Sequence, residues 1–322
     1  MKHIYKEIDI RNIPGFMIGQ AEDVEAGTGT TVILCGEKGA CTGVDIRGGG
    51  PASRECGLLN PLAANDAVHA IVLSGGSAFG LDCAGGVMQY LEERNIGFRT
   101  GFGNVPIVVA SCLFDLPVGS AKVRPNAEMG YHACCAAPNF SEGNHGCGTG
   151  ATVGKAKGPQ FMMKSGIGSY AVQLGDLLVG AVVGVNAMGD VIDPATGKKL
   201  AGVLSNEGTL DASCEEEMWK LSMNPFTGVT NTTIGAILTN ADLNKTELTK
   251  VAGMAHDGYA RTIYPVHTMF DGDSIYASST RSVKADINVV GSLAAMVMAK
   301  AILNAVKHCE GAYGLKCASD FK

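Results

Sequence analysis

The amino-acid sequence predicts an α/β protein in which helices pack on both sides of stacked β-sheets, folded as one domain. Short β-branched runs alternate with glycine-rich turns and occur in mixed order with amphipathic helical segments, as in layered folds. The 322 residues are 46% apolar and only 17% charged, which indicates a large buried core. Neither a low-complexity linker nor a repeat of fixed period divides the sequence into separate units.

The elements follow from local patterns along the chain. Runs of apolar, β-branched residues between turn signals predict strands at Thr31–Cys35, Cys41–Arg47, Ala70–Ser74, Pro106–Ala110, Gly180–Val185, Thr232–Thr239 and Ser274–Ser278. Helical spacing predicts a helix after the turn Ser74–Gly80, with Ala84, Val87, Met88 and Leu91 on its apolar side. Further helices are predicted at Lys245–Arg261, capped near Asn244 or Thr246, and at Val283–Lys307.

The charge and cysteine content exclude several classes of partner. The net charge is 25 − 31 = −6 and no run of Lys and Arg occurs, so neither nucleic acid nor an anionic membrane is expected as the main partner. The 11 cysteines form no C-x-x-C pair and are expected to be reduced core residues. The first residues lack a signal-peptide core, which predicts a cytoplasmic protein. Asn288 and Lys300 interrupt the apolar segment Ile287–Val306, which is expected to be a buried helix.

Two stretches carry residues suited to amide-bond chemistry. Thr232 lies between a turn and an apolar strand, and a chain cut before it would give this residue both a hydroxyl and its own α-amine. An α-amine has a pKa of about 7.7–8, which suits a general base for that hydroxyl. Asp271 and Asp273, alternate residues at the start of a strand, are expected to face one site and to hold a cation or a protonated amine. On pattern alone, an ordinary turn is the favoured interpretation of the stretch at Thr232 and stays an alternative for the aspartate pair.

Two other stretches leave ligand binding as an alternative. His256 and His267 lie near aspartates, but their spacing matches neither H-E-x-x-H nor an EF-hand, so no metal or other cofactor is expected. The turn Gly75–Gly80 before a helix favours close strand–helix packing, with an anion or substrate carboxylate as the alternative occupant. Ser77 lacks the G-x-S-x-G pattern of a nucleophile elbow.

Motifs in matching order along nearly the whole chain add a further inference. They are Ile13–Gly15, Gly27–Val32, Gly43–Gly49, Leu73–Asp82, Gly148–Lys155, Asn231–Ile234, His256–Gly258 and Pro265–Thr268. In these stretches the sequence resembles the family of DmpA-like aminopeptidases and nylon-oligomer (6-aminohexanoate oligomer) hydrolases, which are self-cleaving N-terminal-nucleophile hydrolases. The resemblance implies a four-layer αββα sandwich, of the type also found in ornithine acetyltransferase.

The resemblance also implies a processed chain and a set of site residues. Cleavage between Asn231 and Thr232 would give an α chain, residues 1–231, and a β chain, residues 232–322, which together form one intertwined domain. Thr232 would be the nucleophile, and Lys155, Asn186, Asp271 and Asp273 fall where the nylon-oligomer branch places its other active-site residues. The Asn-Thr cleavage site is similar to that branch, whereas the aminopeptidase branch typically cuts at Gly-Ser, so the substrate stays open between short peptides and oligoamides.

The implied mechanism is hydrolysis through an acyl-enzyme on Thr232, near a free amino terminus of the substrate. The aspartates would orient an amine, Lys155 would tune the local proton affinity, and Asn186 would donate to the oxyanion. The resemblance further implies a homo-oligomer of αβ units without a cofactor. Three alternatives stay open at this point: Thr233 as the nucleophile, acyl transfer as in ornithine acetyltransferase, and an unprocessed module that binds an anion at Gly75.

Overall fold

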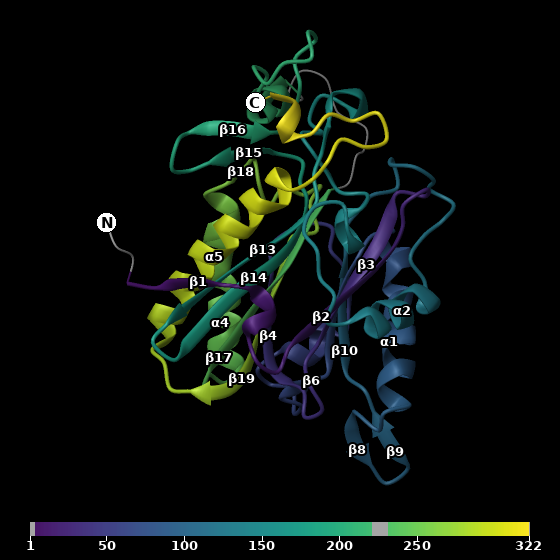
Figure 1. The fold of residues 1–322 in the computed structure, drawn as a ribbon, viewed down its shortest axis with the longest axis vertical. Helices are drawn as coiled ribbons and strands as arrows, with labels where there is room; N and C mark the ends of the chain where they lie inside the picture. Colours follow the sequence, from purple (N-terminus) through teal and green to yellow (C-terminus); the bar gives the residue numbers. More distant parts are fainter. Residues whose placement is uncertain (1–3, 221–230, 322) are drawn as a thin grey trace.

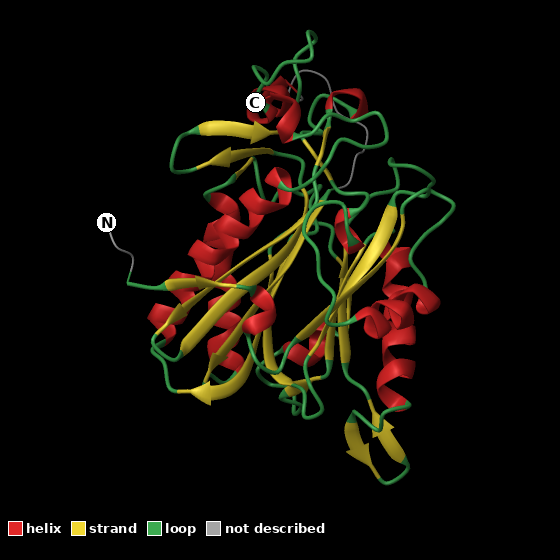
Figure 2. Cartoon of the chain, in the orientation of Figure 1, coloured by secondary structure: helices red, strands yellow, loops and turns green. Residues whose placement is uncertain are grey.

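Two β-sheets lie face to face at the centre of the molecule, and helices cover their outer faces (Figures 1 and 2). The structure is a computed structural model that describes residues 4–220 and 231–321. The helices are α1 (Cys83–Glu92), α2 (Ala127–Ala136), α3 (Cys214–Trp219), α4 (Lys245–Ala260) and α5 (Ile287–Lys307). Helices α4 and α5 pack on one sheet, and α1 and α2 pack on the other.

The larger sheet has seven strands in the order β1-β13-β14-β17-β19-β4-β6. Their bounds in that order are Lys6–Ile8, Ile167–Leu174, Leu177–Asn186, Thr232–Ala241, Ser274–Val283, Ala40–Ile46 and Ala67–Val68. Strands β17 and β19 run parallel, and the other neighbours in this sheet are antiparallel. The residues after 231 therefore supply two central strands, which lie between strands supplied by the residues before 231.

The smaller sheet has five strands in the order β2-β3-β7-β10-β5. They are Met17–Asp23, Thr28–Leu34, Ala70–Ser74, Val108–Cys112 and Ala52–Arg54. Short strands outside the two sheets form small ladders: β8 (Phe98–Thr100) with β9 (Gly103–Val105), β11 (Thr152–Val153) with β12 (Met163–Lys164), and β15 (Asp190–Asp193) with β16 (Lys198–Ala201) and β18 (Ile263–Tyr264).

Three apolar layers separate the four layers of backbone. One lies between α4, α5 and the larger sheet, one between the two sheets, and one between the smaller sheet and α1, α2. Along β17, Ile234 and Leu238 belong to the layer between the sheets, whereas Ile237 belongs to the helix layer. By the two-residue alternation of a strand, Thr232 faces the other sheet and Thr233 faces α4 and α5. The predicted four-layer αββα sandwich is confirmed.

Most predicted elements occur, with shifted ends. Strand β7 has the predicted bounds, and α4 begins at Lys245 behind Asn244, whose side chain forms a capping box with Glu247. The predicted helix start at Val283 is wrong because β19 continues to that residue, and Asp286 caps α5 at Ile287. Strand β10 starts at Val108, two residues after the prediction.

The cysteines are predicted to be reduced core residues, and the structure agrees for nine of the 11, which are free and buried. The prediction is wrong for Cys135, which is exposed, and Cys56 is only partly buried. Cys135 lies in α2, a helix that the sequence patterns did not predict. Helix α5 is long and apolar enough to span a membrane by length and composition, but 67% of its apolar window is buried inside this fold, against β13, β14 and α4.

Candidate active site

The bond at which the sequence predicts self-cleavage lies where β17 begins. Thr232 is the first residue of that strand, is 4% exposed, and pairs directly with Asn186, the last residue of β14. The Thr232 Oγ1 donates a hydrogen bond to the carbonyl oxygen of the preceding residue, Asn231. The backbone N–H of Gly272 donates to that same oxygen at 3.0 Å. The hydroxyl and a backbone donor thus meet at one carbonyl group, buried at the end of the central strands.

Lys155 forms a buried pair with Asn186, the residue opposite Thr232. The Lys155 Nζ donates to Asn186 Oδ1 at 2.7 Å and to the Asn186 backbone oxygen at 3.1 Å. Asn186 Oδ1 also accepts the Thr152 N–H at 3.0 Å, and Nδ2 donates to the Phe114 oxygen at 2.8 Å, so the network fixes the orientation of the amide. Burial lowers the pKa of Lys155 to about 7, and the negative charges of Asp271 and Asp115 raise it by a smaller amount.

Asp271 and Asp273 flank Gly272 on the approach to β19. Asp273 Oδ1 accepts the Thr233 N–H at 2.8 Å, and its Oδ2 accepts both the N–H and the Nδ1 of His267 at 3.1 and 2.8 Å. Asp271 forms an isolated bridge with Asn231, and its Oδ2 accepts the Thr268 N–H at 3.0 Å and the Thr268 hydroxyl. Burial raises the pKa of Asp271, with repulsion from Asp273 as the second cause.

The five residues predicted from the sequence lie in one connected group. Thr232 pairs with Asn186, Asn186 binds Lys155, and the charge of Lys155 acts on Asp271. All five are at most 4% exposed. The structure therefore brings together residues that are far apart in the sequence, while the role of each residue stays a prediction.

Sequence patterns missed two residues of this group. Gly272 supplies the N–H to the Asn231 carbonyl, and a Cβ at this position would lie 2.8 Å from Thr232 Oγ1. Asp115 is 2% exposed and its pKa is raised by burial, although Thr28 Oγ1 and the Gly76 N–H each bind it at 2.7 Å. A glycine between two aspartates was the only local signal for the first. The second depends on contacts between distant segments.

The glycine-rich turn proved to be a packing element. Gly75 N–H donates to the Gly29 oxygen at 2.8 Å, Gly76 N–H to Asp115 Oδ1 at 2.7 Å and Ser77 N–H to the Leu113 oxygen at 2.9 Å. A Cβ at Gly75 would come within 2.0 Å of Asp115 Oδ2. Since internal groups occupy these donors, the alternative of an anion site at Gly75 is wrong, and close packing explains the glycines.

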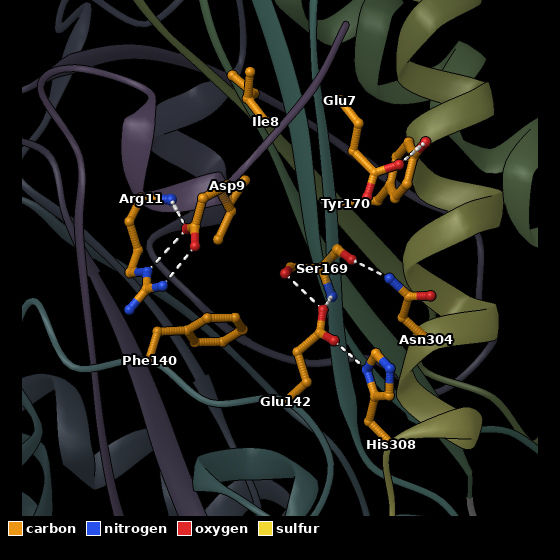
Figure 3. Close-up of a pocket in the computed structure, with 11 residues that line it drawn as sticks. Glu7, Ile8, Asp9, Arg11, Phe140, Glu142, Ser169, Tyr170, Asn304 and His308 are labelled. Atoms are coloured by element: carbon orange, nitrogen blue, oxygen red, sulfur yellow. Dashed lines mark hydrogen bonds and ion pairs between the residues drawn. The ribbon is translucent and has the colours of Figure 1, made fainter.

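A surface pocket of about 340 Å³ lies elsewhere, beside the β1 edge of the larger sheet (Figure 3). Its charged side chains bind one another or neighbouring groups. Glu7 binds Tyr170, Asp9 binds Arg11, and Glu142 binds Ser169 and His308. Strands β13 and β14 separate this edge from β17, so the pocket is not part of the group around Thr232.

Comparisons with known proteins agree with this picture. The model of peptidase family S58 matches residues 9–318. An uncharacterized aminopeptidase of Mycobacterium tuberculosis is 36% identical, with 97% of each chain covered. A 6-aminohexanoate-oligomer endohydrolase of Kocuria sp. is 32% identical over 92% of this chain and 85% of the relative.

Among solved structures, the L-aminopeptidase D-Ala-esterase/amidase of Ochrobactrum anthropi, described as a variant of the Ntn hydrolase fold, superimposes with a TM-score of 0.71. It is 17% identical, and the match covers 93% of this chain and 86% of that one. The four-layer fold and these relatives define the chain as an amide-bond hydrolase with an Ntn-hydrolase-like fold. It belongs to peptidase family S58, as the match across almost its whole length shows.

Proposed function

We propose that the chain cuts itself between Asn231 and Thr232 and then hydrolyses short peptides or oligoamides through an ester on Thr232. The observation that carries this proposal is the buried contact between the Thr232 hydroxyl and the Asn231 carbonyl group, whose oxygen also accepts the Gly272 N–H. A nucleophile beside an acceptor carbonyl that already has a donor is the arrangement needed for acyl transfer.

In the first reaction, Thr232 Oγ1 attacks the Asn231 carbonyl carbon, and the Thr232 nitrogen takes up the proton that the hydroxyl loses and leaves as the new α-amine. The Gly272 N–H stabilises the oxyanion. Before cleavage the Thr232 nitrogen is an amide and cannot serve as a base. The buried amine of Lys155 is the neighbouring group suited to receive the hydroxyl proton, because burial lowers its pKa to about 7. Water then hydrolyses the ester and leaves a carboxylate on Asn231.

In the second reaction, the free α-amine of Thr232 is the base for its own hydroxyl. Three oxygens of Asp271 and Asp273 accept hydrogen bonds from Thr268, Thr233 and His267. Within residues 4–220 and 231–321, the hydrogen bonds of the Asp271 carboxylate go to its Oδ2, and its Oδ1 accepts none. This oxygen is the acceptor available to the new α-amine or to a substrate ammonium group.

The proposed substrates carry a free amino terminus, as short peptides or as oligomers of an ω-amino acid. Relatives described as aminopeptidases and as a 6-aminohexanoate-oligomer endohydrolase support both classes. A buried carboxylate beside the nucleophile favours an ammonium group close to the scissile bond. We also propose a homo-oligomer of processed αβ units, which light scattering of the processed protein would test.

Intact-mass spectrometry tests the self-cleavage. Wild-type protein should give two fragments that meet between Asn231 and Thr232, Thr232→Ser should give the same fragments, and Thr232→Ala should stay uncut. Processed protein should then hydrolyse a free peptide or a 6-aminohexanoate trimer faster than its N-acetylated form. A wild-type chain that stays uncut after long incubation would refute the mechanism. Equal rates on free and acetylated substrates would refute the preference for an amino terminus.

A further inference from the structure

Four buried polar atoms without a partner belong to Thr233 on β17 and to three aromatic residues that contact one another on the α4 side of this strand. They are Thr233 Oγ1, Tyr259 OH, His256 Nδ1 and His267 Nε2, and none has a hydrogen-bond partner among the residues that the structure describes. The ring centroids of the two histidines are 4.7 Å apart, and that of Tyr259 lies 5.1 Å from His256 and 5.9 Å from His267.

Thr233 belongs to the same group by strand alternation. Thr233 and Gly235 share the face of β17 that looks towards α4, and a Cβ on Gly235 would lie 3.1 Å from Tyr259 OH. Leaving a buried polar group without a partner is unfavourable. Four such groups on neighbouring residues therefore indicate a common ligand rather than four separate defects.

The protonation of each group can be worked out from its other contacts. His256 Nε2 lies 3.1 Å from the Asp45 backbone oxygen, which only accepts, so Nε2 carries the proton and Nδ1 is an acceptor. In the tautomer of His267 that donates Nδ1–H to Asp273 Oδ2, Nε2 is an acceptor. The Thr233 and Tyr259 hydroxyls are donors. Two acceptors and two donors match the hydrogen-bonding capacity of one water molecule.

A cation fits this group less well. Burial raises the pKa of Tyr259 well above its ordinary value, so this hydroxyl keeps its proton, and the Thr233 hydroxyl is neutral as well. A metal ion would gain only the two imidazole nitrogens as strong ligands, because both oxygens of Asp273 are already bound by Thr233 and His267.

We propose that one ordered water binds Thr233, Tyr259, His256 and His267, and that His267, fixed by this water, is a positioning residue for Thr232. The kinetic part of this inference rests on the proposed function, whereas the water site does not. His267 acts through Asp273, because Asp273 Oδ2 accepts from His267 while its Oδ1 accepts the Thr233 N–H at 2.8 Å. That N–H belongs to the peptide group that follows Thr232, so holding it fixes the backbone of the nucleophile.

The backbone of His267 supports a positioning role. Its φ is +58°, a left-handed conformation that is strained for a non-glycine residue and that recurs at functional sites. Asp273, which is 1% exposed, holds this conformation because its Oδ2 binds both the backbone N–H and the ring of His267. One carboxylate thus links the His267 loop to the strand of the nucleophile.

Matched variants of the full chain test the kinetic part. In His267→Asn the amide nitrogen takes the place of Nδ1 and keeps the bond to Asp273, whereas in His267→Gln it takes the place of Nε2. We expect His267→Asn to self-cleave within about tenfold of wild type, and His267→Gln to be slower by about 10²-fold, since small misplacements have effects of that size. In the processed His267→Gln enzyme, kcat should fall relative to wild type and KM should stay unchanged. Equal rates in the two variants, or losses of rate that follow losses of stability, would overturn the positioning role.

A second measurement keeps the inference testable when these variants do not fold or the wild type does not cleave itself. A crystal structure of the Thr232→Ala chain at high resolution should show one water within hydrogen-bond distance of His267 Nε2 and His256 Nδ1, and Tyr259→Phe should weaken it. Direct contact between the two rings without a water would overturn the site. An uncut wild-type chain that does contain this water would refute the proposed self-cleavage and confirm the water site.

Discussion

The buried amine of Lys155 should make the stability of the fold depend on pH in a specific window. Burial lowers its pKa from 10.5 to about 7, so between these values the unfolded chain binds a proton that the folded chain does not. The contribution of Lys155 to stability therefore rises as the pH rises from 7 towards 10.5. Above that range the amine is neutral in both states, and its burial carries no charge penalty.

The magnitude follows from the size of the shift. Each unit of pKa difference corresponds to about 1.36 kcal/mol. Integrated from pH 7 to pH 9, with half of the folded chains protonated at the start, one such group changes the free energy of unfolding by about 2 kcal/mol. Lys155→Met removes this group and should remove that part of the pH dependence.

Urea denaturation measures the effect, in a Thr232→Ala background that keeps the chain in one piece. The free energies of unfolding of Thr232→Ala and of Thr232→Ala with Lys155→Met are compared at pH 7 and pH 9. The difference between the two proteins should move by about 2 kcal/mol in favour of the one with Lys155. The exposed Lys198, changed to Met in the same background, is the matched control. A difference that stays constant would show that Lys155 remains charged in the fold, and it would refute its role as a base in self-cleavage.

Three further variants test other contacts of the site. Thr233→Val should still give the two fragments, because the Thr233 hydroxyl faces α4. If Thr233→Val stayed uncut and Thr232→Val cleaved itself, Thr233 would be the nucleophile. Gly272→Ala should slow self-cleavage by about 10²-fold or more, because its Cβ would lie 2.8 Å from Thr232 Oγ1. The control Gly101→Ala should cleave at the wild-type rate, because a Cβ there has no neighbour within 4 Å. Equal cleavage rates of the two variants in mass spectra taken over time would contradict this expectation. Lys164→Met should lower the free energy of unfolding, measured in urea, by about 3 kcal/mol or more. The reason is that the Lys164 Nζ donates to the backbone oxygens of Gly148, Ala151 and Ser165. A loss below about 1 kcal/mol would contradict this expectation.

Local patterns predicted those elements whose signals are contained in a few neighbouring residues. Strand β7 is a continuous apolar run that ends at a glycine turn, and α4 carries its own cap, so both start where the sequence predicts. The start of α5 was misplaced because Val283 satisfies a helical spacing as well as the end of a strand. The pairing of β19 with β17 extends the strand to Val283, and the cap at Asp286 then starts the helix.

The residues of the candidate site also fall into those that local motifs predicted and those that only tertiary contacts show. Thr232, Lys155, Asn186, Asp271 and Asp273 were predicted because short motifs around them resemble a known family. Asp115 carries no such motif, and its partner Thr28 lies 87 residues away in the sequence. The contacts of His267 likewise depend on how α4 packs behind β17. Groups that act through tertiary contacts are visible only when those contacts are known.

The position of the predicted cut explains how cleavage could leave the fold intact and at the same time create a base. Strand β17 lies between β14 and β19, so the new amino terminus at Thr232 stays held by a central ladder. Its α-amine would then share the buried site with Lys155 and with Asp271, whose charge acts on Lys155 and whose Oδ2 already binds Thr268. Two ammonium groups cannot both keep their charge beside one carboxylate in a dry site, because repulsion and burial both favour losing a proton. One of the two amines is therefore expected to be neutral at pH 7, which is the state that a general base for the Thr232 hydroxyl requires.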